Sequence, residues 1–258
     1  MILEICVDSV DSARAAEHGG AQRVELCSDL AEGGISPSAG LIDGVRAALD
    51  IPLFVMVRPR AGDFQYSADE FKIMRKDIAV AKEYGADGVV LGLLKADGTI
   101  DVERTGELVA LARPMQVTFH RAIDLVAEIE EALQQVIASG VDRVLTSGGK
   151  KSAVAALGCL TRLVAQAKGK IAVMVCGGIR KGNVEQIARA TDATEFHSSP
   201  RVKLLTGQMP ILNLGTPGID EWSRYVVSSE DVRAMRTVMD RLEAGVSSAT
   251  DLSSFIER

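Results

Sequence analysis

A Glu-x-Cys pattern occurs twice near the start of the sequence, as Glu4/Cys6 and again as Glu25/Cys27. Each copy sits in a short run of β-forming residues, and alternate side chains of a strand point to the same face. Adjacent strands lie about 4.8 Å apart, so Cys6 and Cys27 could together hold one soft metal ion, Cu(I) or zinc. Buried cysteines also commonly serve only as packing residues, so the spacing leaves both interpretations open.

A second set of residues favours the binding of a small anion. Cationic or potentially cationic side chains follow predicted strands, and two Gly-Gly turns each come after a strand and before a helix. Backbone N–H groups in such turns favour a phosphate or a carboxylate. The ligand-binding residues predicted on this basis are Arg58, Arg60, Arg121, Ser147, Gly148, Gly177, Gly178 and His197.

If the anion is a substrate, the chain would be an isomerase, lyase or hydrolase acting on a small phosphorylated or carboxylated molecule. His120 is then the predicted general acid or base, because an ordinary histidine has a pKa near neutrality. Glu25 or Glu195 would be its partner, and Asp124 belongs to the same catalytic set. Alternatively, Glu25, His120, Glu195 and His197 could hold a harder divalent ion.

The elements that must position these residues alternate between strand and helix over the first 200 residues. The predicted strands are Leu3–Asp8, Arg23–Ser28, Leu53–Arg58, Gly88–Leu94, Gln116–His120, Arg143–Ser147, Ile171–Cys176 and Thr194–Ser198. Helical periods between them include Ser67–Tyr84, Val126–Ala138 and Asn183–Ala190. This alternation predicts an α/β fold, a (β/α)8 TIM barrel. A doubly wound open sheet would usually carry a Gly-rich loop after its first strand, whereas Asp8-Ser9 leads straight into a helix.

The pattern changes after Pro200. Arg201–Glu221 contains five Gly or Pro positions without a clear period and predicts a surface loop, and Ser229–Leu242 predicts a final helix. We therefore expect a single domain over residues 1–258, with a barrel core at about 1–200 and a C-terminal extension at about 201–258.

The alternation of strand side chains predicts an acidic barrel lumen that contains Glu4, Glu25 and Glu195. Buried charge is costly unless it is paired. Candidate partners are Arg23, Arg58, Arg60, Arg121, Arg143, His120 and His197. A salt-bridged interior that performs no chemistry is the alternative interpretation of this set.

Composition excludes several classes of protein. The chain has 258 residues, of which 47% are hydrophobic and 25% are charged, and its net charge is −6. An acidic chain is poorly suited to neutralising nucleic-acid phosphates. No apolar run approaches the roughly 20 residues that span a bilayer, and the start MILEICVDS lacks the basic region of a signal peptide. The four cysteines are too few for a disulfide scaffold, so we expect reduced thiols in a cytoplasmic protein.

Several stretches resemble the CutC family of copper homeostasis proteins. They include E-I-C-V-D-S at 4–9, G-G-A-Q-R-V-E-L-C-S at 19–28, V-M-V-R-P-R-A-G-D-F-Q-Y at 55–66, V-T-F-H-R-A-I-D at 117–124 and A-T-E-F-H-S-S at 193–199. The resemblance implies a cytoplasmic TIM barrel that binds Cu(I), with Cys6 and Cys27 as the matching ligands, and a homo-oligomer, with a dimer favoured. Two thiolates do not require the arginines and histidines of these motifs, so an anionic small molecule remains the alternative ligand.

Overall fold

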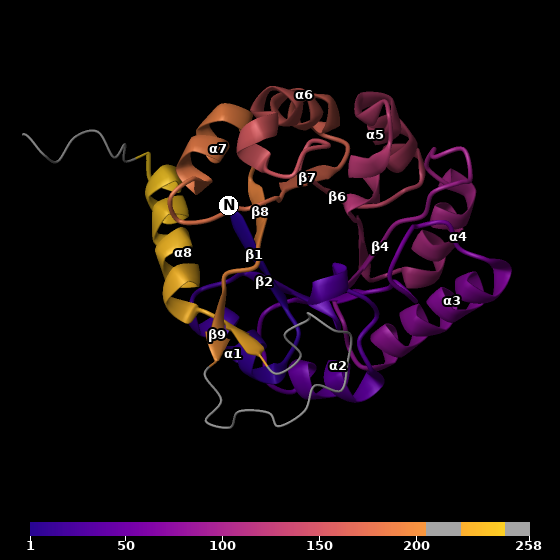
Figure 1. Ribbon diagram of the computed structural model, residues 1–258, viewed down its shortest axis with the longest axis horizontal. Helices are drawn as coiled ribbons and strands as arrows, with labels where there is room; N and C mark the ends of the chain where they lie inside the picture. Colours follow the sequence, from indigo (N-terminus) through magenta and orange to yellow (C-terminus); the bar gives the residue numbers. More distant parts are fainter. Residues whose placement is uncertain (205–222, 246–258) are drawn as a thin grey trace, which may run out of the picture.

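Eight parallel strands form a closed barrel in sequence order, surrounded by helices (Figure 1). The computed structural model describes residues 1–204 and 223–245. The last barrel strand pairs with the first, where Glu4 lies opposite His197. The predicted (β/α)8 TIM barrel is confirmed.

The barrel strands are β1 Ile2–Val7, β2 Arg23–Leu26, β3 Leu53–Met56, β4 Gly88–Leu91, β5 Gln116–Phe119, β6 Arg143–Thr146, β7 Ala172–Val175 and β8 Glu195–Ser198. The helices are α1 Val10–His18, α2 Ala39–Arg46, α3 Ala68–Glu83, α4 Val102–Ala112, α5 Ile129–Ala138, α6 Leu157–Ala167, α7 Val184–Thr191 and α8 Ser229–Glu243. Every predicted strand exists, but most were predicted to extend too far. The fourth was predicted to end at Leu94, which instead forms an isolated bridge with Ile100.

Local sequence signals fix the helix ends. The hydroxyl of Ser67 caps α3 in a capping box with Glu70, and α3 buries Met74, Ile78 and Ala81 at helical spacing. The helix predicted over Val126–Ala138 begins only at Ile129, because residues 121–125 form a 3-10 helix and Val126 is extended.

The barrel strands separate the apolar layer beneath the helices from the barrel lumen. Ile5, Leu26 and Phe196 are fully buried in the large apolar layer between barrel and helices, as their alternation with the acids predicts. The lumen holds a smaller cluster that contains Cys6 and Cys27. Side chains next to one another in sequence therefore lie in two different environments.

The C-terminal segment differs in part from its prediction. Arg201–Leu204 forms β9, which pairs with β10 at Arg224–Val227 in an antiparallel ribbon. The surface loop predicted over Arg201–Glu221 is therefore wrong for its first four residues, and the rest of that loop lies outside the described residues. The predicted final helix is confirmed as α8, which packs beside α1 and α7 (Figure 1).

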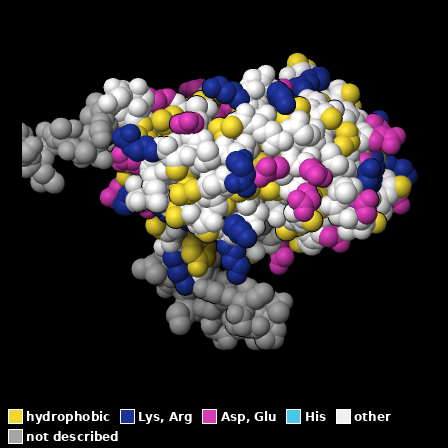
Figure 2. All heavy atoms as spheres, turned by 90° about the horizontal axis from the view of Figure 1, so that it is seen from above, with side chains coloured by type: hydrophobic (Ala, Val, Ile, Leu, Met, Phe, Trp, Pro, Cys, Tyr) yellow, Lys and Arg dark blue, Asp and Glu magenta, His cyan; other side chains and the backbone are white. Residues whose placement is uncertain are grey.

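The surface carries both signs of charge. On the face drawn in Figure 2, acidic and basic side chains are interspersed over the body of the molecule. Within residues 1–204 and 223–245, no helix has the length and apolar character needed to cross a membrane.

Candidate functional site

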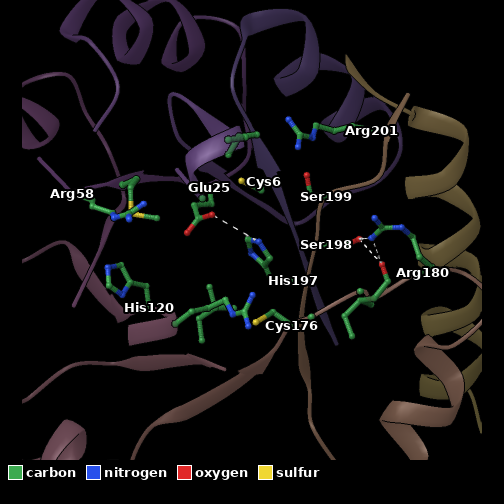
Figure 3. Close-up of a pocket in the computed structure, with 18 of the residues that line it drawn as sticks. Cys6, Glu25, Arg58, His120, Cys176, Arg180, His197, Ser198, Ser199 and Arg201 are labelled. Carbon is green, nitrogen blue, oxygen red and sulfur yellow. Dashed lines mark hydrogen bonds and ion pairs between the residues drawn. The ribbon is translucent and has the colours of Figure 1, made fainter. Parts of the chain in front are cut away.

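The carboxyl ends of the barrel strands surround a cavity of about 290 Å³, here called the mouth cavity (Figure 3). Its lining comprises Cys6, Glu25, Leu30, Gly33, Met56, Arg58, Phe64, His120, Arg121, Leu145, Cys176, Gly177, Gly178, Ile179, Arg180, His197, Ser198, Ser199 and Arg201. This is the end of a TIM barrel at which binding and catalytic sites are found.

Two cysteines meet at the cavity wall. The Sγ atoms of Cys6 and Cys27 lie 3.8 Å apart, and both side chains are buried and free of disulfide. The Cys27 Sγ also lies 3.6 Å from Oε2 of Glu25, and these three residues can offer ligand atoms within 4.8 Å of one another. The structure thus joins the two Glu-x-Cys motifs at one point.

The two thiols have different proton affinities. The hydrogen bond with Cys27 lowers the pKa of Cys6 to about 5, against the effect of burial, and His197 lowers it further. That same hydrogen bond, with burial, raises the pKa of Cys27 well above its usual value. Cys6 is therefore the more acidic of the two thiols, and Cys27 holds its proton more tightly.

His197 is held between two carboxyl groups. Its Nδ1 lies 2.7 Å from Oε1 of Glu4, and its Nε2 lies 3.8 Å from Oε2 of Glu25. Burial alone would raise the pKa of Glu4, but Arg23 and His197 bring that pKa down to about 2. Burial opposes protonation of His197, yet Glu25, Cys6 and Glu4 raise its pKa well above the usual value. The ring is therefore a buried cation.

The pKa of Glu25 is shifted in the opposite direction to that of Glu4. Burial and the neighbouring Cys6 thiolate raise the pKa of Glu25 well above its usual range. Its Oε1 has no hydrogen-bond partner among the described residues. Glu25 therefore binds a proton more tightly than an ordinary carboxyl group does, while the charge of His197 opposes this shift.

Glu195 lies below this group, at the amino end of its strand. Its carboxylate pairs with Arg23 at 2.7 Å and with Arg143 at 2.5 Å, and Arg23 also pairs with Glu4. The expected pairing of the acidic lumen is present. Glu195 does not line the mouth cavity, so the structure does not bring it to His120 as a catalytic partner.

His120 lines the cavity as a neutral ring. Burial, reinforced by the charge of Arg58, lowers its pKa to about 3, so the near-neutral pKa expected for a general acid or base is not found. The backbone N–H of Ala122 donates to its Nδ1, which places the proton on Nε2. That Nε2 is buried and has no partner among the described residues.

The turn after β6 already holds an anion from the protein itself. The Asp124 carboxylate accepts hydrogen bonds from the Thr146 hydroxyl at 2.6 Å and from the N–H groups of Ser147 and Gly149 at 3.1 Å. It also pairs with Arg121 at 2.8 Å. Ser147 and Gly148, predicted as ligand-binding residues, are buried outside the cavity lining, and Asp124 organises the turn.

Arg58 and Arg60, both predicted to bind an anion, differ in their position relative to the cavity. Arg58 is buried at the cavity and donates to the carbonyls of Glu32, Gly34 and Gly62. Arg60 does not line the cavity, because its guanidinium pairs with Glu70 at 2.5 Å and with Asp63 at 3.0 Å.

Four polar residues of the cavity lining were not among the residues predicted from the sequence. They follow β7 and end or follow β8, and they are Arg180, Ser198, Ser199 and Arg201. Their position at or after the ends of predicted strands was the sequence signal that could have indicated a place in the site. Gly177 and Gly178, which were predicted, lie in the same wall.

Residues 1–202 match the family model described as the CutC family. The chain belongs to the CutC family. A CutC family protein of Chromobacterium violaceum is 48% identical over 93% of this chain and 98% of its own length. A human copper homeostasis protein cutC homolog is 52% identical over 78% of this chain and 73% of its own length.

A solved CutC structure from Streptococcus agalactiae has the same fold, with a TM-score of 0.73 and 31% identity. The similarity covers 76% of this chain and 97% of the Streptococcus agalactiae chain. The CutC assignment made from the sequence motifs is thus confirmed. The match to the family model extends through β8 and ends within β9.

Proposed function

We infer that this CutC protein binds Cu(I) between Cys6 and Cys27 and serves copper homeostasis in the cytoplasm. The observation that carries the proposal is the pair of buried sulfurs 3.8 Å apart, one on β1 and the other directly after the adjacent strand β2. Relatives named for copper homeostasis support the same assignment.

The two thiols suit a soft metal ion. A thiolate sulfur bonds a metal at roughly 2.3 Å, so sulfurs separated by less than twice that distance can share one ion. Thiolates favour Cu(I) over hard cations. Cys6 faces the cavity and is the more acidic thiol, whereas Cys27 holds its proton more tightly and must lose it when a metal binds. Cu(I) binding should therefore release protons.

A competition titration with a Cu(I) chelator, performed without oxygen, tests the proposal. Wild type should compete for Cu(I), and Cys6→Ser and Cys27→Ser should each weaken the affinity at least tenfold. Cys159→Ser is a control because Cys159 lies on α6, away from the cavity. Cys176→Ser is a closer control, because Cys176 lines the cavity but packs in a separate cluster with Leu145 and Met174.

Equal Cu(I) affinity in wild type and both Cys6 and Cys27 variants would contradict the proposal and leave these cysteines as packing residues. A loss of affinity in Cys176→Ser as large as in Cys6→Ser would also contradict it, because the effect would then come from general disturbance of the cavity.

Other expectations accompany this proposal. The cytoplasmic location, the homo-oligomer with a dimer favoured, and the absence of nucleic-acid partners stay predictions. The alternative function, an enzyme acting on a small anion, is favoured by a different observation, the unpartnered polar groups of His120 and Glu25 in the cavity.

A further inference from the structure

The mouth cavity contains a buried cation, Arg58, that pairs with no carboxylate of residues 1–204 and 223–245. Arg58 is 5% exposed, and the acceptors of its guanidinium are three backbone carbonyls. Its Nε has no hydrogen-bond partner within the described residues. An arginine buried without a counter-ion is costly, and an anion bound in the cavity would offset that cost.

His120 adds a neutral donor on the same side. Its ring packs on Phe64 with centroids 4.7 Å apart, and the guanidinium carbon of Arg58 lies 4.9 Å from the centroid of that phenyl ring. His120 and Arg58 therefore both contact the phenyl ring of Phe64. The protonated Nε2 of His120 has no acceptor among the described residues, and Figure 3 shows the His120 and Arg58 side chains next to each other.

The opposite wall offers a second anion-binding group. The loops after β7 and β8 place Gly178, Arg180, Ser199 and Arg201 around the cavity, with both arginines on the far side from Arg58 in Figure 3. Loops after the seventh and eighth strands commonly bind phosphate in TIM barrels.

Among residues 1–204 and 223–245, these groups have few carboxylate partners. Arg180 contacts the Ile179 carbonyl and the Ser198 hydroxyl, and no carboxylate in the described ranges pairs with it. The Arg201 guanidinium pairs with Asp8 at 3.7 Å, and the buried Ser199 hydroxyl oxygen has no hydrogen-bond partner in the part of the chain that the structure describes. A Cβ added at Gly178 would meet nothing within 4 Å, so this part of the wall is open.

We propose that the mouth cavity binds a small phosphorylated carboxylic acid, with its carboxylate at Arg58 and His120 and its phosphate at Arg180, Ser199 and Arg201. Of the four arginines that line the cavity, Arg121 pairs with Asp124 and Arg201 with Asp8. Arg58 and Arg180 have no carboxylate partner among the described residues, and these two cations on opposite walls favour a ligand with two anionic ends. The site is separate from the sulfur pair, although Cys6 lines the same cavity. The proposal goes beyond copper binding and does not depend on it.

Calorimetric titration with three probes tests both ends of the site at constant ionic strength. The probes are inorganic phosphate, phosphoglycolate and glycolate. Phosphoglycolate should bind at least tenfold more tightly than inorganic phosphate, because only phosphoglycolate carries both a phosphate and a carboxylate. Glycolate should bind more weakly than either.

Variants assign the two ends. Arg180→Met should weaken binding of phosphate and phosphoglycolate at least tenfold, and Ser199→Ala should weaken both to a smaller extent. His120→Asn should weaken phosphoglycolate about tenfold and leave phosphate unchanged. Arg189→Met, on the exposed face of α7, is the matched control and should change neither.

Failure of phosphoglycolate to bind at millimolar concentration would overturn the proposal, as would an equal loss in Arg180→Met and Arg189→Met. Equal affinity for phosphate and phosphoglycolate would overturn the two-ended site. Cu(I) affinity measured on Arg180→Met should match wild type, so failure of this proposal is distinguishable from failure of the copper site.

Discussion

The Nδ1 of His197 lies 2.7 Å from the Oε1 of Glu4, and this contact joins the last barrel strand to the first. The carboxylate is fully buried, and Arg23 and His197 together keep its pKa at about 2 despite the opposing effect of burial. Together with Glu25 and Cys6, the acid of the first Glu-x-Cys motif raises the pKa of the ring beside the Cys6 sulfur. Glu4 acts on the sulfur pair through His197.

Glu4→Gln should destabilise the barrel by about 3–5 kcal/mol, because it removes one partner from a buried ion pair. It should also lower the pKa of His197, which NMR titration of the imidazole C–H signals would measure. Glu107→Gln removes an exposed partner of Arg75 and should cost about 0–1 kcal/mol. Equal losses in chemical denaturation would contradict the assigned role of Glu4, and so would an unchanged pKa of His197.

His120 should make stability depend on pH. Its pKa is about 3 in the folded chain and about 6.5 in an unfolded one, so the unfolded state binds more protons between these values. The free energy of unfolding should therefore fall as pH falls from about 6.5 toward 3, by up to about 1.4 kcal/mol per pH unit from this group. Denaturation of wild type and His120→Asn from pH 5 to 7 would measure the difference.

The matched control is His18→Asn, because His18 lies exposed in the last turn of α1. His18→Asn should keep the wild-type pH dependence. His197 contributes with the opposite sign, since its raised pKa gives stability that is lost as pH rises through the folded value. Parallel pH profiles for wild type and His120→Asn would show that His120 is not a buried neutral base.

Asp124→Ala should destabilise the turn after β6. The change leaves the Thr146 hydroxyl and the N–H groups of Ser147 and Gly149 without their acceptor, and Thr146 and Ser147 are buried. Buried donors without partners cost about 1–3 kcal/mol each, so we expect a loss of roughly 3 kcal/mol or more. Asp97→Ala, in an exposed turn where Asp97 accepts from Thr99, is the control and should cost well under this amount. Similar losses would contradict the assigned role of Asp124.

Periodicity was enough to predict the barrel and the sulfur pair. Strand–helix alternation places the eight strands, and the period of two puts Glu4 and Cys6 on the lumen face with Glu25 and Cys27. These features follow from local pattern together with the closure of a parallel sheet.

Pairing partners were not predictable from local pattern. Arg60 and Arg58 are two residues apart, yet one pairs with Glu70 outside the cavity while the other lies buried in it. The Gly-Gly turn after β6 has the composition of an anion site, but a carboxylate from the preceding loop fills it. Such competition between a ligand and the protein's own side chains is decided by tertiary contacts.

The most direct measurement for the copper site is X-ray absorption at the copper edge on protein loaded with one equivalent of Cu(I). Scattering from two sulfur neighbours, lost in the Cys6→Ser/Cys27→Ser variant and retained in Cys159→Ser, is the predicted result. A copper environment of nitrogen and oxygen alone, or sulfur scattering unchanged in the double variant, would contradict the assignment of Cys6 and Cys27 as the ligands.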